Sequence, residues 1–258
     1  MNKSQTLFVS VISLATVSMS AIAKPAEAAY LTFFGQDQGQ GENVRLGSTP
    51  NSDTARASFF SNLQNVGTET FESISAGTSA PIAVAFGADT ATITGSGSVQ
   101  SQGSGTNGVG RYPISGTNFY EVSGFFNLTF NNAQAAFGFY GVDIGDFNGQ
   151  VTLTLTKIGG GTTTFTVPTT QTAGGGALYF GLIGTDASEQ FTSVRFGNTA
   201  RGVDFFAFDD FSIGNQSQVV PVRPVPVPGV AAGILLAAGV FGGKQIRKRK
   251  LQSSKSQA

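Results

Sequence analysis

Residues 151–156 alternate strictly between an aliphatic side chain and threonine, reading Val-Thr-Leu-Thr-Leu-Thr. This period of two residues predicts a β-strand with one face in a core and the other face in water. Gly159-Gly160-Gly161 follows, and 162–167 is again rich in threonine, which predicts an antiparallel hairpin. Strands that pair in this way favour an all-β fold over alternating β and α units.

Similar runs predict the remaining strands. They lie at 30–34, 69–74, 82–86, 90–94, 124–130, 135–144, 177–183, 191–196 and 203–213. Asn148-Gly149 favours a type I′ turn, which would join 135–144 to 151–158 as a second hairpin. The Gly/Ser/Gln-rich stretch 95–110 is expected to be a mobile loop. We therefore expect an antiparallel β-sandwich or jelly roll.

One segment, 51–65, has the periodicity of a helix. Its apolar residues recur every four positions and share one face: Ala55, Phe59 and Leu63. Ser52 or Asp53 is expected to cap its N-terminus. The sandwich is therefore expected to carry one short N-terminal helix.

The dipeptide Phe-Gly recurs along the chain, at 34–35, 86–87, 137–138, 180–181 and 196–197. The spacing is irregular, which is not typical of a repeat protein. These glycines are expected at strand ends or β-bulges.

The N-terminus has the pattern of a secretory signal peptide. Lys3 precedes an apolar run at 7–19, and small residues follow. Both Ala21-Ile22-Ala23 and Ala26-Glu27-Ala28 fit the small-x-small cleavage rule, so we expect cleavage after Ala23 or Ala28.

The C-terminus combines a proline-rich stretch, an uncharged apolar segment at 229–243 and a basic cluster. The cluster consists of Lys244, Arg247, Lys248, Arg249 and Lys250. Fifteen helical residues span roughly 22 Å, less than the ~30 Å hydrocarbon core of a bilayer. We predict a short transmembrane-type helix whose basic end stays on the cytoplasmic side, with a buried or amphipathic helix as the alternative.

These features divide the chain into six parts. They are a signal peptide (1–28), a strand, loop and helix (29–66), the β-sandwich (67–215), a proline-rich linker with a sorting motif (216–228), the short transmembrane helix with its basic stop (229–250) and a polar tail (251–258).

The tail resembles the PEP-CTERM sorting signals of bacteria, which join a Val-Pro-Glu-Pro-like motif to a short helix and a basic cluster. The motif here is Val225, Pro226, Val227 and Pro228, with Val227 where the family has Glu. The resemblance implies transient residence in the inner membrane, an exosortase-type membrane protease as partner, and delivery to a cell surface or extracellular matrix rich in exopolysaccharide.

Most of the segment 52–214 is similar to ectodomains commonly attached to such tails in cyanobacteria. The resemblance rests on Ala55-Arg56 with Phe59, Thr70-Phe71-Glu72, Gly108-Val109-Gly110-Arg111-Tyr112, the 141–149 loop and the 208–211 ending. It implies no established biochemical activity.

Composition excludes several classes of function. The chain has no cysteine and no histidine, which excludes thiolate or imidazole metal sites and Ser-His-Asp hydrolysis. Between 29 and 228 there are seven basic and 14 acidic residues. Nucleic acid is therefore excluded as a partner, and cations are favoured over phosphates.

Glu72, Asp209 and Asp210 are the candidate calcium ligands. In a regular strand Asp209 would share a face with apolar residues, namely Val203, Phe205, Ala207, Phe211 and Ile213. A carboxylate there needs a partner, and calcium takes six to eight oxygen ligands. An early Phe-Glu with a late Asp-Asp also resembles the structural calcium site of extracellular β-sandwich families. The alternatives are pairing with Arg195 or Arg201, or a bulge that turns the carboxylate to solvent.

Arg111, Tyr112 and Tyr120 are candidates for lining a polysaccharide groove, or alternatively for anchoring loops. Asp143 and Asp146 form an acidic loop, of a kind that usually makes turns. No pattern brackets the carboxylate pair that a glycosidase needs. We expect an exported, non-catalytic protein with a structural or adhesive role in exopolysaccharide. The alternatives are a carbohydrate-binding module and, third, a carbohydrate-active enzyme.

Overall fold

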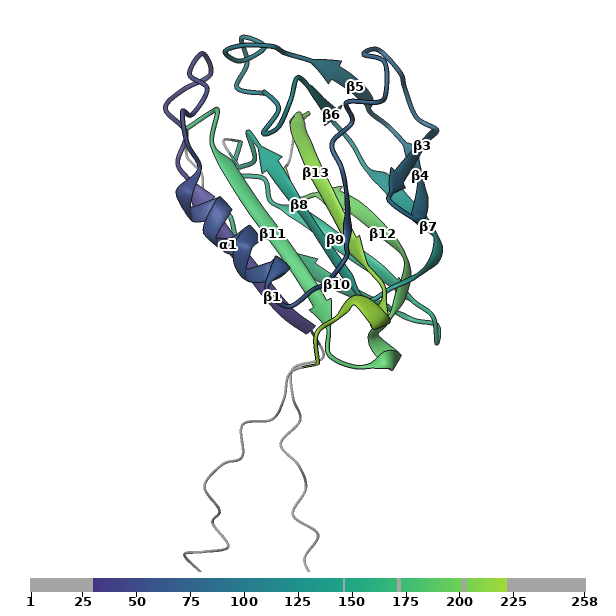
Figure 1. Cartoon of the computed structure of the whole chain (residues 1–258). Coiled ribbons are helices and arrows are strands. Elements are labelled where there is room, and N and C mark those ends of the chain that lie inside the picture. The colour runs from purple at the N-terminus through teal and green to yellow at the C-terminus, as the bar shows by residue number, and fades with distance from the viewer. Residues whose placement is uncertain (1–29, 146, 171–172, 201–202, 222–258) are drawn as a thin grey trace, which may run out of the picture.

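Two antiparallel sheets face each other in the structure, a computed structural model that describes residues 30–221 except 146, 171–172 and 201–202 (Figure 1). The seven-stranded sheet has the order β1-β11-β8-β13-β6-β5, and β2 also pairs with β13. The six-stranded sheet has the order β10-β9-β12-β7-β4-β3. The predicted antiparallel β-sandwich is therefore confirmed.

The strands of the seven-stranded sheet are β1 (Tyr30–Asp37), β2 (Gly67–Glu69), β5 (Ser98–Ser101), β6 (Asn118–Val122), β8 (Ala136–Val142), β11 (Ala177–Gly184) and β13 (Phe206–Gly214). Those of the six-stranded sheet are β3 (Ile82–Phe86), β4 (Asp89–Gly95), β7 (Phe126–Gln134), β9 (Val151–Lys157), β10 (Thr162–Thr166) and β12 (Phe191–Asn198). The helices are α1 (Pro50–Phe60) and two short 3₁₀ turns, η1 (Ala187–Glu189) and η2 (Gln216–Gln218).

The two predicted hairpins have different outcomes. β9 and β10 pair as expected, with Thr156 opposite Thr162. The hairpin across Asn148-Gly149 is wrong, because β8 and β9 belong to different sheets. The turn there, in which the Asn148 amide donates to the Gly145 carbonyl at 3.1 Å, carries the chain from one sheet to the other.

The stretch 95–110 is not all loop. It contains β5, whose Val99 side chain is fully buried, and β5 pairs with β6, which the sequence patterns did not predict. The prediction for 69–74 was also wrong in its extent, because β2 ends at Glu69. Both Glu69 carboxylate oxygens then accept backbone hydrogen bonds, from Phe71 at 2.7 Å and Ala85 at 3.0 Å.

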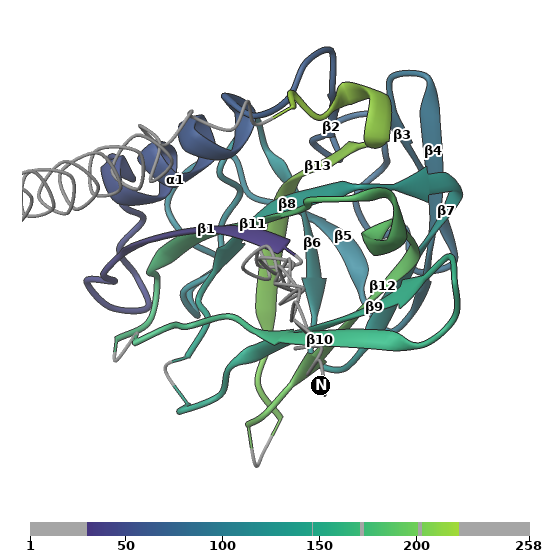
Figure 2. The same cartoon turned by 90° about the horizontal axis from the view of Figure 1, so that it is seen from below.

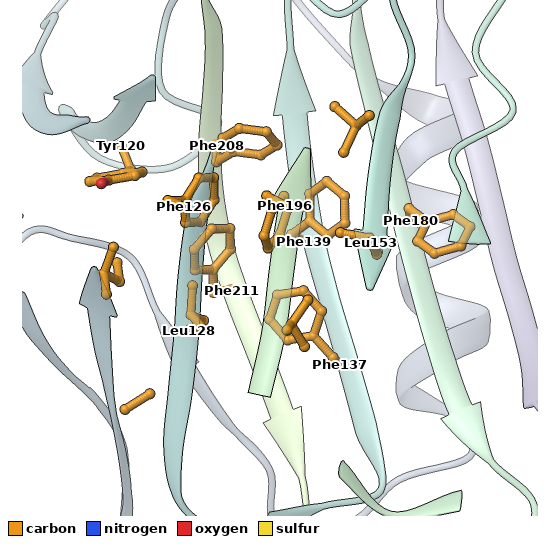
Figure 3. Packing of buried hydrophobic residues seen from close by; sticks show 14 of the residues in the cluster. Tyr120, Phe126, Leu128, Phe137, Phe139, Leu153, Phe180, Phe196, Phe208 and Phe211 are labelled. Carbon is orange, nitrogen blue, oxygen red and sulfur yellow. The ribbon is translucent and has the colours of Figure 1, made fainter. Parts of the chain in front are cut away.

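Phenylalanine rings fill the space between the sheets (Figure 3). Phe196 of β12 stacks on Phe126 of β7 with ring centroids 4.3 Å apart. From the opposite sheet, Phe139 and Phe208 approach Phe196 to 5.1 and 5.0 Å. The high phenylalanine content is thus used to join the two layers, which lack disulfides.

Helix α1 covers the outer face of β1 and β11, on the side away from β9 and β10 (Figures 1 and 2). Its predicted apolar face is confirmed for Ala55 and Phe59, which are both buried. The predicted extent, 51–65, is too long, because α1 ends at Phe60 and Leu63 is buried beyond the helix, in a bridge with Val219. Phe59 rests on two glycines that are paired across strands, Gly138 of β8 and Gly181 of β11. A Cβ atom on Gly181 would lie 2.6 Å from the Phe59 ring, so the helix needs glycine there.

The predicted cap of α1 is wrong. Thr49 is the N-cap residue and makes no capping hydrogen bond through its side chain. The carboxylate of Asp37, at the end of β1, accepts hydrogen bonds from the backbone amides of Asn51 at 3.1 Å and Ser52 at 2.9 Å. The helix is therefore capped by a neighbouring strand, and Ser52 donates its hydroxyl to the same carboxylate.

A bulge in β13 reverses the expected face of Asp209. The register shifts between Asp209 and Ser212, and Asp210 has φ of 48°. Phe206 and Phe208 face the core on one side of the bulge, and Phe211 and Ile213 on the other side. Asp209 therefore does not lie on the core face.

Several expectations concern residues outside the described part of the chain. They are the signal peptide (1–28), the sorting motif (225–228), the apolar segment (229–243) and the basic cluster (244–250). Within the described residues, none of the helices has the length and apolar character needed to cross a bilayer.

Candidate functional site

A hollow of about 230 Å³ is lined by residues that follow β8 and precede β13. These two strand ends lie at the top of Figure 1. We call this hollow the apical hollow. Its polar lining residues are Glu42, Arg111, Asp143 and Asp204, and its apolar lining residues are Val109, Phe147, Val203 and Phe205. The described chain begins with β1 and ends after η2 at the opposite end of the sandwich.

Four loops are tied together beneath this hollow. The Glu42 carbonyl accepts hydrogen bonds from the Gly110 amide at 2.9 Å and the Thr106 hydroxyl at 2.6 Å. Asp143 adopts a positive φ of 64°, and its Oδ1 accepts a hydrogen bond from the Gly175 amide at 2.9 Å. Because a Cβ atom on Gly110 would overlap the Asp143 carboxylate, glycine is required for this close approach.

Arg111 is the centre of the polar side of the hollow. Its Nε lies 2.6 Å from Glu121 Oε2, and its Nη1 lies 3.4 Å from Asp143 Oδ2. The guanidinium also lies over the ring of Phe205, 5.2 Å from the centroid. Its orientation is thus fixed from three sides, which leaves a planar donor group in a set position.

The apolar side of the hollow is unusually open to solvent. Val203 is 75% exposed, Phe147 66%, Val109 47% and Phe205 40%. Large apolar side chains gathered in one place on a surface commonly mark a binding site. Sequence reasoning noted the 141–149 loop but assigned Phe205 to the core face, because that assignment treated 203–213 as one regular strand without a bulge.

The other two candidate glycan residues do not face the hollow. Tyr120 is fully buried in the core, and its hydroxyl donates to the Ser96 carbonyl at 2.6 Å. Tyr112 is 2% exposed and donates to the Gly175 carbonyl at 3.0 Å, and burial raises the pKa of its hydroxyl to about 12. Neither ring offers a face to a sugar, so both anchor loops, and of the three candidates only Arg111 lines the hollow.

The three candidate calcium ligands bind backbone and hydroxyl groups of the 113–118 segment. Glu72 accepts hydrogen bonds from the amides of Thr117 at 2.8 Å and Asn118 at 2.6 Å. Asp209 Oδ2 accepts from the amides of Ile114 and Ser115, and Asp210 Oδ1 from the Ser115 hydroxyl at 2.6 Å. The described residues contain no group of three acidic side chains placed to hold a metal, and calcium binding stays a prediction.

Burial controls the protonation of the Asp209 and Asp210 pair. It raises the pKa of Asp209 well above its usual range, and the neighbouring charge of Asp210 raises it further. Burial also raises the pKa of Asp210, against the opposing effects of the Ser115 hydroxyl and the Arg56 charge. Both shifts favour the protonated, neutral form of these carboxyl groups relative to an exposed aspartate.

No family model and no curated protein match this chain. Among solved structures it is similar to the K2 adhesin domain of Lys-gingipain, at 13% identity and a TM-score of 0.35 over 58% of this chain and 97% of that one. It is also similar to the CBM22-1 xylan-binding domain of Paenibacillus barcinonensis Xyn10C, at 13% identity and a TM-score of 0.36 over 63% of this chain and 99% of that one. A third similar structure is the C-terminal family 22 carbohydrate-binding module of Clostridium thermocellum Xyn10B, at 16% identity and a TM-score of 0.33 over 59% of this chain and 95% of that one. These identities and TM-scores are too low to carry any property of those proteins over to this chain.

Proposed function

We propose that the protein is an exported, non-catalytic module that binds extracellular polysaccharide in the apical hollow. The observation that carries the proposal is the pair of exposed rings, Phe147 and Phe205, beside the fixed guanidinium of Arg111. A sugar ring has an apolar face that packs on an aromatic ring and hydroxyl groups that pair with planar polar side chains. The apical hollow has both kinds of group.

The charge of the hollow favours an uncharged polysaccharide. Three carboxylates line it, those of Glu42, Asp143 and Asp204, against the single guanidinium of Arg111. A uronate or sulfate group would be repelled by this excess of negative charge. Neutral hydroxyl groups would instead meet several hydrogen-bond acceptors.

The arrangement of the carboxylates supports binding rather than hydrolysis. A glycosidase places two carboxyl groups on either side of the scissile bond. Of the three carboxylates that line the hollow, Asp143 is already engaged by the guanidinium of Arg111 and by the Gly175 amide, which gives it a structural role. We therefore propose a binding module over a carbohydrate-active enzyme.

The position of the hollow suits a protein delivered by its tail. The start of β1 and the end of β13 lie at the end of the sandwich opposite to the ends of β8 and β13 that border the hollow (Figure 1). A protein held or handled through its C-terminal segment would therefore present the hollow outward. We propose export by the signal peptide and sorting to the matrix by the PEP-CTERM-like tail, with an exosortase-type protease as partner.

Sorting by cleavage predicts a shortened product. We expect the protein recovered from culture medium to end near Pro228, which removes the apolar and basic segments of the tail. Intact-mass measurement of that protein checks the terminus. A full-length chain ending at Ala258 and found only in membranes would contradict the prediction and indicate a plain anchor.

Glycan binding predicts a loss of affinity when the rings are removed. We expect Phe147→Ala and Phe205→Ala each to weaken binding to a neutral polysaccharide by about tenfold, equivalent to about 1.4 kcal/mol. Affinity electrophoresis of the full chain through gels containing xylan, glucan, mannan or alginate measures this. Phe125→Ala is the matched control, because Phe125 is 52% exposed but does not line the hollow.

Four outcomes would count against this function. Equal retardation of wild type and both hollow variants would exclude the hollow as the site. Tighter binding to alginate than to every neutral polymer would contradict the charge argument. Release of reducing sugar that is abolished by replacing one carboxylate would show an enzyme. If no polymer binds at all, a structural role in the matrix becomes the better explanation.

A further inference from the structure

A second, larger hollow of about 700 Å³ runs beside the outer edge of β1, between α1 and the segment that follows β10. We propose that this edge groove is a separate binding site for an uncharged polysaccharide. The proposal shares its ligand class with the proposed function but uses no residue of the apical hollow. Its principal lining residues are Phe34, Gln36, Gln38, Asn51, Thr54 and Ser58.

The chemistry of the groove matches a neutral sugar chain. None of the described residues that line it is Asp, Glu, Lys or Arg, so an ionic ligand has no partner. The side-chain amide of Gln38 offers a donor and an acceptor. The side-chain oxygens of Asn51 and Thr54 offer acceptors, because their own N–H and O–H groups are bound within the protein. Phe34 is 37% exposed and supplies an apolar ring for a sugar face.

The polar side chains of the groove are held in place by the protein itself. Gln36 Oε1 accepts hydrogen bonds from the Thr170 amide at 3.0 Å and the Thr169 hydroxyl at 3.3 Å. Asn51 Nδ2 donates to the Gln36 carbonyl at 3.1 Å and to Asp37 Oδ1 at 2.9 Å. Side chains that are already ordered lose little entropy when a ligand binds.

A peptide strand added to β1 is the competing occupant, because β1 lies at the end of its sheet. One carbonyl near the end of β1 is already engaged by α1, because the Gln36 carbonyl accepts a hydrogen bond from the Asn51 side-chain amide at 3.1 Å. Side chains of α1 and of the segment after β10 also line the groove beside this strand. A peptide strand that paired with β1 here would compete with these groups, which favours a sugar chain over a peptide.

Two sites on one molecule would allow it to join polysaccharide chains. The apical hollow lies at one end of the sandwich, whereas the edge groove follows its side along β1 and α1. A molecule with two such sites binds a polymer network with higher avidity than either site alone. Cross-linking is a stronger form of the adhesive role than simple attachment.

The test blocks the groove from the exposed face of α1. Ser58 is exposed and lines the groove, whereas the neighbouring Ala57 is exposed and does not line it. Ser58→Arg places a long side chain in the groove, and Ala57→Arg is its matched control with the same charge. Phe34→Ala is a second variant that removes the ring without adding bulk.

Calorimetric titration of the full chain with neutral hexasaccharides of xylan, cellulose and mannan measures the affinities. We expect two sites in the wild type, of which Ser58→Arg weakens one by more than about tenfold and Phe34→Ala weakens the same one by about threefold. Ala57→Arg is expected to leave both sites unchanged. Thermal unfolding of each variant shows whether it is folded.

The outcomes separate this proposal from the apical site. Loss of one site in Ser58→Arg and of the other in the double variant of Phe147 and Phe205 supports both. Loss only in Ser58→Arg supports the groove and overturns the apical site. Identical titrations of Ser58→Arg and Ala57→Arg with every hexasaccharide overturn the groove, even if an extended peptide binds there.

Discussion

Replacing Phe196 by alanine is expected to lower the free energy of unfolding by about 3 to 5 kcal/mol, the usual cost of removing a buried aromatic ring. Phe196 is 1% exposed and lies between the two sheets. It stacks on Phe126 within its own sheet and meets Phe139 and Phe208 of the other. Its loss would leave a cavity at the contact between the layers.

Urea unfolding of the full chain, followed by circular dichroism, measures this change. Phe147→Ala is the matched control, because Phe147 is 66% exposed, and we expect it to alter stability by no more than about 0.5 kcal/mol. Equal losses for the two variants would show that Phe196 does not join the sheets as described.

Replacing Asp37 by alanine is expected to lower the free energy of unfolding by about 2 to 4 kcal/mol, since hydrogen bonds to a charged group are the stronger kind. Asp37 is 7% exposed, and its carboxylate accepts four hydrogen bonds from the start of α1. They come from the amide and side chain of Asn51 and from the amide and hydroxyl of Ser52, at 2.7 to 3.1 Å. Without the carboxylate, two amides at the helix start lose their acceptor.

Asp37→Asn tests the same contact more gently, because it keeps one acceptor oxygen of the side chain. We expect it to cost less than Asp37→Ala, and thermal unfolding of both variants gives the order. Protection of the α1 amides from hydrogen exchange should fall together with stability. A loss below about 0.5 kcal/mol for Asp37→Ala would mean that α1 is held by its apolar face alone.

The Phe-Gly pairs show how far local sequence could be followed. Their glycines were expected at strand ends or bulges, yet Gly138 and Gly181 lie within β8 and β11. They face each other across the two strands and make room for Phe59 of α1. Each preceding phenylalanine points into the core. The Phe-Gly pattern marked positions where only glycine fits, but the reason at these two positions is the packing of α1, which comes from a distant part of the chain.

The candidate site was less accessible to sequence reasoning than the fold. Arg111 was identified, but Phe147 and Phe205, which give the apical hollow its apolar side, were not. An exposed phenylalanine in a loop has the same local pattern as a buried one at a strand end. For Tyr112 and Tyr120 the sequence left two alternatives open, groove lining and loop anchoring, and the structure shows both tyrosines buried with their hydroxyls bonded to carbonyls, as loop anchors.

The sequence by itself determined the all-β class, the apolar face of α1 and the β9–β10 hairpin. These follow from side-chain spacing over a few residues, which reports directly on the period of a strand or helix. The tertiary structure alone decided which sheet receives β8 and β9, that Asp37 caps α1, and that a bulge turns Asp209 away from the core. It also brought Glu42, Arg111, Asp143 and Phe205 together around one hollow. Each of these depends on contacts between residues far apart in the chain, and no local pattern encodes such contacts.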